Sequence, residues 1–164
     1  MAEKNQKDVK KSIQAFYDAK VDSFMSRQLP LIGAKSTVGD VLHRMGNLST
    51  DHLWVIDSEK GDKFVGVITE KDILRGLSSP YTSEDMEWDI LGLKSITYGS
   101  AKTAGDIMSK HIITAKSSTT VGEVIRLMTQ NRIRRLPVVD RDKLIGEVTV
   151  HQIAGQVSKN LLKK

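Results

Sequence analysis

The sequence predicts an α+β fold in which one small unit of strands and helices occurs twice. Residues 136–139 and 144–148 are short, branched, apolar runs separated by a polar turn at residues 140–143, a pattern typical of a β-hairpin. Thr149 follows the second run directly and begins a helical pattern, which completes a β-β-α unit. The same order of patterns is found earlier in the chain, over residues 53–74.

The two copies match over most of their length. Thr37 lies 83 positions before Thr120, and the helical patterns that follow these two threonines align without a gap. The offset falls to 80 between Thr69 and Thr149, because the first hairpin has a longer loop. Such a duplication predicts two small halves that share an interface.

Each copy has a helix that is expected to begin at a threonine cap. The first follows Thr37, with Asp40 at the third helical position, and the second follows Thr120, with Glu123 completing a capping box. Their apolar residues recur at i, i+3, i+4 and i+7, so each helix buries one face. These residues are Val38, Val41, Leu42 and Met45 in the first helix and Val121, Val124, Ile125 and Met128 in the second.

Gly66 and Gly146 lie inside predicted strands. A glycine at such a position marks either a β-bulge or a place where another group approaches the backbone closely. Both interpretations remain open for both residues.

The remaining segments are expected to flank the repeats. Residues 1–11 are polar, and a helix is expected over residues 12–24, packed on the first repeat. A short helix is expected after Ser83. The predicted division is an N-terminal tail and helix (1–20), a first repeat (21–77), an insertion (78–103), a second repeat (104–157) and a basic C-terminal tail (158–164).

Composition excludes several classes of protein. There are no cysteines, which excludes disulfides and thiolate chemistry. No apolar run approaches the roughly 18 residues of a membrane span, and the first residues lack the apolar core of a secretory signal. The expectation is a cytoplasmic protein with no membrane partner.

The chain is basic, with a net charge of +5 and a pI near 9.4. This favours an anionic partner such as nucleic acid, a membrane surface or a phosphate-bearing ligand. Much of the excess lies in lysines near the two ends, which is typical of solvated chain ends. The internal basic group consists of Arg132, Arg134 and Arg135.

Several short motifs together resemble a known family. They are Asp-Ile-Met-Ser at 106–109, Thr-Val-Gly-Glu-Val at 120–124, Arg-Leu-Pro-Val-Val-Asp at 135–140, Gly-Glu-Val-Thr at 146–149 and Gly-Val-Ile-Thr-Glu-Lys-Asp-Ile-Leu at 66–74. The chain resembles the paired CBS domain, or Bateman module. The resemblance implies tandem β-α-β-β-α repeats related by a pseudo-two-fold axis, with a cleft on each side of that axis for AMP, ADP, ATP or S-adenosylmethionine. It also implies a regulatory module, not an enzyme, which often forms a homodimer and acts on a regulated protein partner.

An adenosine ligand needs a carboxylate for its ribose hydroxyls and a cation or helix N-terminus for its phosphates. Thr69 and Asp72 share the first turn of a helix, whose free N–H groups are expected to face a phosphate. The resemblance implies that Asp72 holds the ribose and that Thr69 lies near the phosphate, and Lys71 is a further candidate. From the local motif alone, Thr69 and Asp72 only cap their helix; the duplication favours the ligand site.

The second copy departs from this pattern. Thr149 is retained, but Gln152 replaces the acid, and this Thr-x-x-Gln spacing predicts a capping box. A neutral amide lacks the paired strong acceptors of a carboxylate. The prediction is one competent cleft at Asp72 and one weakened or altered cleft at Gln152.

The resemblance also implies that further residues line the Asp72 cleft. Candidates for its walls are His111, Ile113, Thr114 and Ile133. Candidates for phosphate contacts are His52, Arg134 and Arg135. For the two arginines, a solvated edge or an ion pair with a nearby carboxylate remains an open alternative.

Other chemistries lack the residues they need. The histidines show no metal-ligand spacing, and no nucleophile elbow, Walker loop or dinucleotide fingerprint is present. The function that the resemblance implies is the sensing of an adenine nucleotide between two repeats. A nucleic-acid-associated basic protein and a structural dimerisation module with empty clefts are the alternatives.

Overall fold

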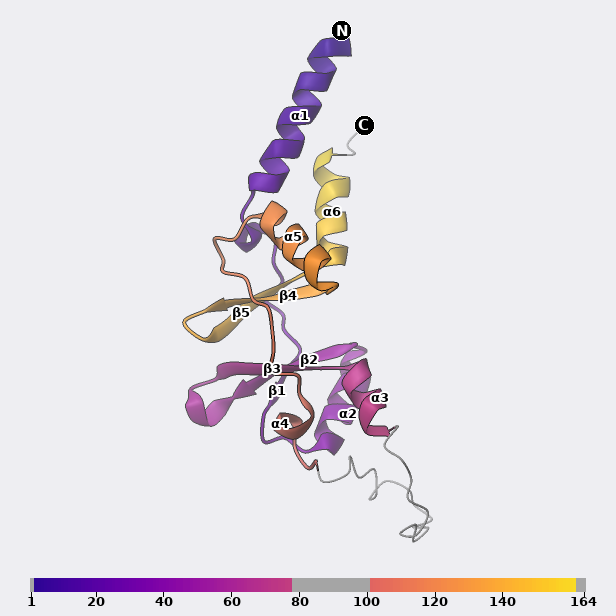
Figure 1. Cartoon of the computed structure of the whole chain (residues 1–164), viewed down its shortest axis with the longest axis vertical. Coiled ribbons are helices and arrows are strands. Elements are labelled where there is room, and N and C mark those ends of the chain that lie inside the picture. Colours follow the sequence, from indigo (N-terminus) through magenta and orange to yellow (C-terminus); the bar gives the residue numbers. More distant parts are fainter. Residues whose placement is uncertain (1, 78–100, 162–164) are drawn as a thin grey trace. The chain divides into compact units, whose positions relative to one another are not determined.

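The structure is a computed structural model that describes residues 2–77 and 101–161. These residues form two compact units (Figure 1). Unit 1 contains residues 1–29 and 113–164, and unit 2 contains residues 30–112. The short helix predicted after Ser83 lies outside the described residues.

Unit 2 is a three-stranded sheet with its helices on one face (Figure 1). Strand β1 (Leu31–Gly33) pairs in parallel with β2 (His52–Asp57), which pairs antiparallel with β3 (Lys63–Thr69). The helices of this unit are α2 (Val38–Leu48), the 3₁₀ turn η2 (Ser58–Lys60), α3 (Glu70–Leu77) and α4 (Ala104–Ile107). The buried core consists of Ile32, Val41, Met45, Leu53, Val55, Ile68 and Ala104.

Unit 1 repeats this plan with a reduced sheet. Strands β4 (Arg135–Asp140) and β5 (Lys143–Thr149) form a hairpin, and Ala115 pairs in parallel with Val138 where the other unit has its β1 strand. The helices of this unit are α1 (Ala2–Asp18), the 3₁₀ turn η1 (Val21–Ser23), α5 (Val121–Asn131) and α6 (Val150–Leu161). Its core consists of Phe16, Val21, Met25, Ala115, Val121, Val124, Met128, Leu136, Val138, Val148 and Ile153. The predicted α+β class is confirmed. The first copy has the full order strand, helix, strand, strand, helix, and in the second copy the first strand is reduced to the Ala115–Val138 bridge.

The predicted caps form at both helix starts, but they are not identical. The Thr37 hydroxyl accepts from the Asp40 N–H at 3.1 Å, and the Asp40 carboxylate accepts from the Thr37 N–H at 2.9 Å. The hydroxyl and the N–H of Thr37 lower the pKa of Asp40 below its ordinary value of 3.8. In α5 the Thr120 hydroxyl accepts from the Glu123 N–H. Among the hydrogen bonds of the described residues, none runs from the Thr120 N–H to the Glu123 carboxylate. The Glu123 carboxylate lies 3.9 Å from Arg126 instead, so the predicted second half of that box is wrong.

The N-terminal helix differs from the prediction in its bounds and in its contacts. It runs from Ala2 to Asp18, whereas residues 1–11 were expected to be a tail and the helix was expected to reach residue 24. It begins early because Ala, Glu, Lys and Gln, all good helix formers, supply most of its first turns. It ends at Asp18 because the Val21 N–H bonds to Thr119 and the Val121 N–H bonds to Ala19, which holds this stretch extended.

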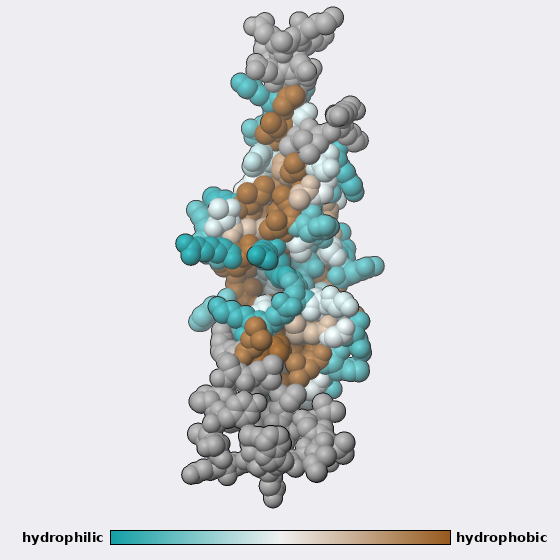
Figure 2. Space-filling view, turned by 90° about the vertical axis from the view of Figure 1, so that its right-hand side faces the viewer, coloured by the Kyte–Doolittle hydropathy of each residue, from teal (hydrophilic) through white to brown (hydrophobic). Residues whose placement is uncertain are grey.

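Helix α1 packs on helices of the second copy, not on the first repeat as predicted. It contacts α5 and α6, and Phe16 is buried in the core of unit 1. A Cβ on Gly122 would lie 3.0 Å from the Tyr17 ring, so the glycine allows the close approach of α5 to α1. Val9, Ile13 and Tyr17 are exposed side chains on α1. Figure 2 shows that hydrophobic residues reach the surface on one face of the molecule.

The compact units do not coincide with the predicted repeats, because each repeat gives its first segment to the other unit. Ser26 belongs to the first repeat by sequence, yet its N–H and C=O both bond to Glu147 of β5. Ser109 stands at the matching position of the second repeat, and it bonds in the same two-way manner to Val67 of β3. The exchange is reciprocal, so each unit contains residues from both repeats.

Both interpretations of the strand glycines hold. The ladder register shifts opposite Gly66, between Val55 and Ile56, and it shifts at the equivalent place opposite Gly146. A Cβ on Gly66 would lie 2.3 Å from the Met108 sulfur, and one on Gly146 would lie 2.5 Å from the Met25 sulfur. The bulge and the close approach occur together because each exchanged segment passes its methionine over the bulged strand.

Candidate functional site

Three side chains of unit 2 meet where its hairpin enters α3, and His52 lies beside them in the ladder. His52 begins β2 and is paired in the ladder with Thr69, the last residue of β3. Asp72 follows on the first turn of α3, and Ser109 is held beside β3 by its backbone pairing with Val67. We call His52, Thr69, Asp72 and Ser109 the Asp72 site.

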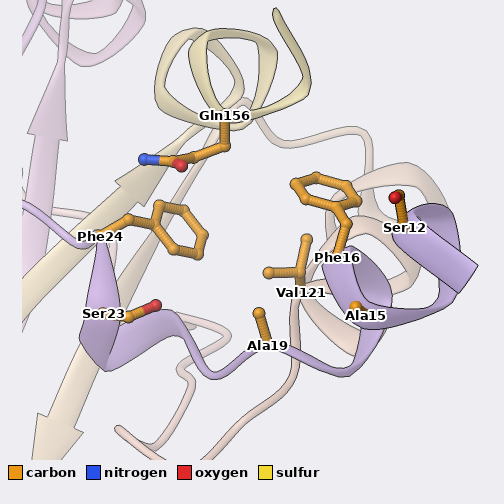
Figure 3. Close-up of a pocket in the computed structure, with 8 residues that line it drawn as sticks. All are labelled: Ser12, Ala15, Phe16, Ala19, Ser23, Phe24, Val121 and Gln156. Carbon is orange, nitrogen blue, oxygen red and sulfur yellow. The ribbon is translucent and has the colours of Figure 1, made fainter. Parts of the chain in front are cut away.

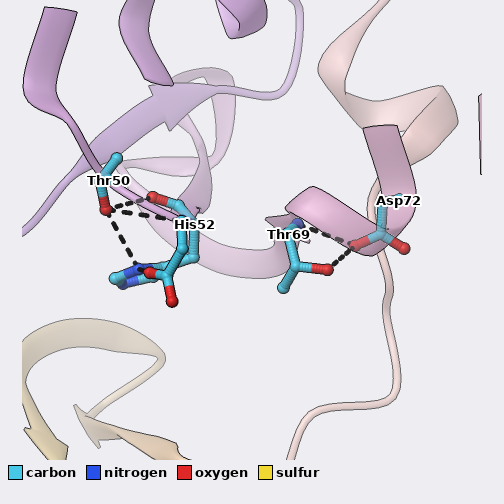
Figure 4. A network of polar contacts seen from close by, with 5 residues as sticks. Thr50, His52, Thr69 and Asp72 are labelled. Carbon is cyan, nitrogen blue, oxygen red and sulfur yellow. Dashed lines mark hydrogen bonds and ion pairs between the residues drawn. The ribbon is translucent and has the colours of Figure 1, made fainter. Parts of the chain in front are cut away.

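Asp72 is a buried carboxylate with hydrogen bonds at both oxygens. Its side chain is only 5% exposed. Oδ2 accepts from the Thr69 N–H and from the Thr69 hydroxyl, both at 2.8 Å (Figure 4). Oδ1 accepts from the Ser109 hydroxyl at 3.2 Å. The carboxylate therefore caps α3, as the local motif predicted, and it also contacts the exchanged segment.

The start of α3 offers fewer N–H groups than the sequence suggested. The Thr69 N–H donates to Asp72, and the Glu70 N–H donates to the Asp51 carbonyl at 3.2 Å. The prediction of free N–H groups is therefore wrong for these two residues. The positive end of the helix dipole is still located here, and it stabilises a nearby anion without a direct bond.

His52 is part of the same corner, and its ring is engaged within unit 2. Nδ1 lies 3.1 Å from the Asp51 carboxylate and 3.3 Å from the Thr50 hydroxyl (Figure 4). The ring also packs edge-on against Trp54, with the centroids 5.0 Å apart. His52 is 4% exposed, so these neighbours hold the imidazole in place. Its predicted phosphate contact stays a prediction.

The matching corner of unit 1 has the same backbone and a different side chain. Arg135 pairs with Thr149 in the ladder, as His52 does with Thr69. The Gln152 amide oxygen accepts from the Thr149 N–H at 2.7 Å and from its hydroxyl at 3.3 Å. The Gln152 N–H returns a bond to the Thr149 hydroxyl at 3.2 Å, so the predicted capping box at this position is confirmed.

The structure distributes the other candidate residues between the two units. Lys71 and His111 are exposed in unit 2. In unit 1, Ile113 and Ile133 are half-buried against the core, Thr114 and Arg134 are exposed, and Arg135 is half-buried. The prediction that these residues line one cleft with Asp72 stays a prediction.

Two features of the structure were missed by the sequence analysis. Ser109 contacts Asp72, and the repeated Met-Ser dipeptide at 25–26 and 108–109 was the signal that could have drawn attention to it. A pocket of about 340 Å³ lies in unit 1, where Phe16 and Phe24 point into one space below Gln156 (Figure 3). No sequence pattern indicated this pocket, because α1 was expected on the other repeat.

Each of the two repeats matches a known protein family. The family model described as CBS domain matches residues 21–79 and again residues 104–159. The chain belongs to the CBS domain family. The identification rests on two matches that together cover more than half of the sequence, and it confirms the resemblance carried by the repeated motifs.

The chain is similar to one curated relative and to two solved structures. The chain is 30% identical over 136 residues to inosine-5′-monophosphate dehydrogenase of Methanocaldococcus jannaschii, a match that spans 82% of this chain and only 23% of that enzyme. It resembles the crystal structure of CBSX2 in complex with AMP, with 29% identity, a TM-score of 0.67, and coverage of 85% of this chain and 96% of that one. It also resembles the CBS domain of a CBS domain containing membrane protein from Sphaerobacter thermophilus, with 23% identity, a TM-score of 0.71, and coverage of 92% and 95%.

The last of these similarities shows the fold alone. In this chain, none of the helices in the described ranges is long and apolar enough to cross a membrane.

Proposed function

We propose that this CBS pair is a regulatory module that binds an adenine nucleotide at the Asp72 site and has no catalytic activity of its own. The observation that carries the proposal is the buried Asp72 carboxylate at the start of α3, held by Thr69 and Ser109. It is supported by the 29% identity to CBSX2, a protein crystallised with AMP.

The chemistry of the site fits a ribose better than a bare phosphate. A carboxylate accepts strongly from two neighbouring hydroxyls, whereas it repels a phosphate at the same position. Phosphates are therefore expected away from the Asp72 carboxylate, near His52, Arg134 and Arg135, with Lys71 as a further candidate. The side chains Ile113 and Ile133 are the proposed apolar walls for the base, and His111 and Thr114 are proposed beside them.

The second site, at Gln152, is proposed to be weak. Both bonds from Thr149 already go to the one amide oxygen of Gln152. The amide is neutral, so a hydroxyl that bonds to it gains less than one that bonds to a carboxylate. We therefore expect one strong site per chain.

Calorimetric titration with AMP, ATP and S-adenosylmethionine tests the proposal, and the ligand that binds most tightly identifies the class. The decisive variant is Asp72→Asn, because an asparagine oxygen still caps α3 and only the charge is lost. Hydrogen bonds to a charged group contribute about 1.5–3 kcal/mol, so the variant should bind roughly 10- to 100-fold more weakly. Gln152→Ala is the matched control at the equivalent position, and it should bind with the affinity of the wild type.

Failure of the wild-type protein to bind any of the three ligands would contradict the proposal. The weight would then move to the dimerisation module or to a nucleic-acid partner. A nucleic-acid partner predicts an affinity that falls steeply with rising salt.

We propose that the module forms a homodimer and transmits nucleotide occupancy to a protein partner. A ligand changes such an equilibrium only by its difference in affinity for the two states. Light scattering with and without the nucleotide measures whether the dimer forms and whether the ligand changes it.

A further inference from the structure

Ser109 has a fixed position in unit 2. Its N–H bonds to the Val67 carbonyl at 2.9 Å, and its own carbonyl accepts from the Val67 N–H at 3.1 Å. The preceding residue, Met108, lies against the Cα of Gly66, where a Cβ would be only 2.3 Å from its sulfur. The backbone that carries the Ser109 hydroxyl is therefore held on both sides.

We propose that Ser109 is a positioning residue that sets the preference of the Asp72 site for ribose over deoxyribose. The proposal rests on the proposed function and extends it to a residue outside the Thr69–Asp72 motif. Thr69 holds Oδ2 with two bonds of 2.8 Å, and Ser109 holds Oδ1 with one bond of 3.2 Å. Bonds to both oxygens fix the plane of the carboxylate. A carboxylate with a fixed plane accepts from two adjacent hydroxyls without a further loss of side-chain freedom.

The equivalent serine in unit 1 shows that the fold does not require this contact. Ser26 makes the same two backbone bonds, to Glu147, each 2.9 Å long. Its hydroxyl, however, donates to the Gln28 carbonyl at 3.2 Å, and among the described hydrogen bonds it makes none to Gln152. The backbone arrangement is thus common to both units, while the serine-to-cap contact occurs where the cap is a carboxylate.

The contact also places one element of the ligand site on the exchanged segment. Ser109 belongs to the second repeat by sequence, and Asp72 belongs to the first. The orientation of the carboxylate therefore depends on Ser109, which lies three residues before the end of unit 2 at residue 112.

The test compares AMP with 2′,3′-dideoxy-AMP in calorimetric titrations of the wild type, Ser109→Ala and Ser26→Ala. The wild type should prefer AMP, and Ser109→Ala should reduce that preference by about threefold to tenfold. This is less than the roughly 10- to 100-fold loss expected without the Asp72 charge, because Ser109 orients the carboxylate and makes no ribose bond itself. The affinity of Ser109→Ala for the dideoxy compound should stay within about twofold of the wild-type value, because this compound has no ribose hydroxyl that could bond to Asp72. Ser26→Ala should keep the wild-type preference, and Ser109→Thr, which retains a hydroxyl, should restore it.

Each outcome decides the question. A wild type that prefers AMP, with a Ser109→Ala variant of unchanged preference, would overturn the role of Ser109 and leave the proposed function intact. A wild type that binds neither compound would overturn the preference assigned to Ser109, and the proposed function would fall as well only if ATP and S-adenosylmethionine also failed to bind. An equal loss of affinity for the two compounds would show that Ser109 only supports the fold. If Ser109→Ala does not fold, Ser109→Cys has nearly the same volume and a much weaker donor, and the same ratio decides.

Discussion

An alanine at Gly66 is expected to destabilise unit 2 by about 1–3 kcal/mol, the usual cost of extra volume in a packed core. The new Cβ would lie 2.3 Å from the sulfur of Met108, 2.8 Å from its Cγ and 3.1 Å from its Cβ. Rotation of the end of the methionine side chain relieves only the first of these contacts. The rest of Met108 cannot move away easily, because the adjacent Ser109 is paired with Val67.

Thermal unfolding followed by circular dichroism measures the effect. A chain of this size changes its Tm by about 2–4 °C per kcal/mol, so Gly66→Ala should lower Tm by roughly 2–12 °C. Gly46→Ala is the matched control, because a Cβ at Gly46 in α2 meets nothing within 4 Å. There the alanine only improves the helix, by about 0.5–1 kcal/mol, and Tm should rise.

A double-mutant cycle identifies the cause of the loss. In a Met108→Ala background the contacts with the sulfur and Cγ are removed and only the 3.1 Å contact with Cβ remains. Gly66→Ala should therefore cost clearly less than it does beside the methionine. An equal cost in both backgrounds, or a Gly66→Ala variant as stable as the wild type, would refute the argument that Met108 requires a glycine here.

Three further predictions concern the caps and α1. Thr37→Ala and Thr120→Ala should each cost about 0.5–2 kcal/mol in chemical denaturation, with the larger loss at Thr37 because only its cap is reciprocal; equal losses would contradict the difference between the two boxes. The pKa values of Asp40 and Asp106 are lowered by cap hydrogen bonds, at Asp40 chiefly from the Thr37 hydroxyl and at Asp106 chiefly from the N–H groups of residues 102 and 103. A lowered pKa adds stability that is present above the ordinary value of 3.8 and is lost as the pH falls through the folded-state pKa; asparagine at both positions should flatten this acid limb of stability against pH, and an unchanged limb would argue against the shifts. Phe16→Ala should cost about 3–5 kcal/mol, since the ring is buried in the core of unit 1; a loss below about 1 kcal/mol would show that α1 is not part of that core.

Local patterns predicted those parts of the fold that depend on neighbours in sequence. The threonine caps, the hairpins and the helix that begins after Thr69 all follow from patterns among residues that are close together in the sequence. The capping box at Thr149 and Gln152 was predicted for the same reason. The internal duplication then gave the number of copies.

The contacts of α1 and the exchange of segments could not be predicted in this way. They depend on pairings between residues about 100 positions apart, such as Lys20 with Thr120 and Ser26 with Glu147. A helical pattern states which face is apolar, but it does not state which partner covers that face. The Ser109 contact was missed for the same reason, since it joins residues that lie 37 positions apart.

The two units share one pattern of backbone hydrogen bonds and differ in the side chain that caps the last helix. Their backbones repeat one pattern, in which an exchanged serine pairs with the second strand of the hairpin and a carbonyl before the hairpin accepts from the first helical N–H. These bonds do not depend on side-chain identity, so the residue at the cap can change without loss of the frame. Asp72 and Gln152 show the consequence, because both cap a helix through a threonine and only one of them brings a negative charge. On the proposed function, this single side chain is what makes one copy the ribose site and leaves the other as support for the fold.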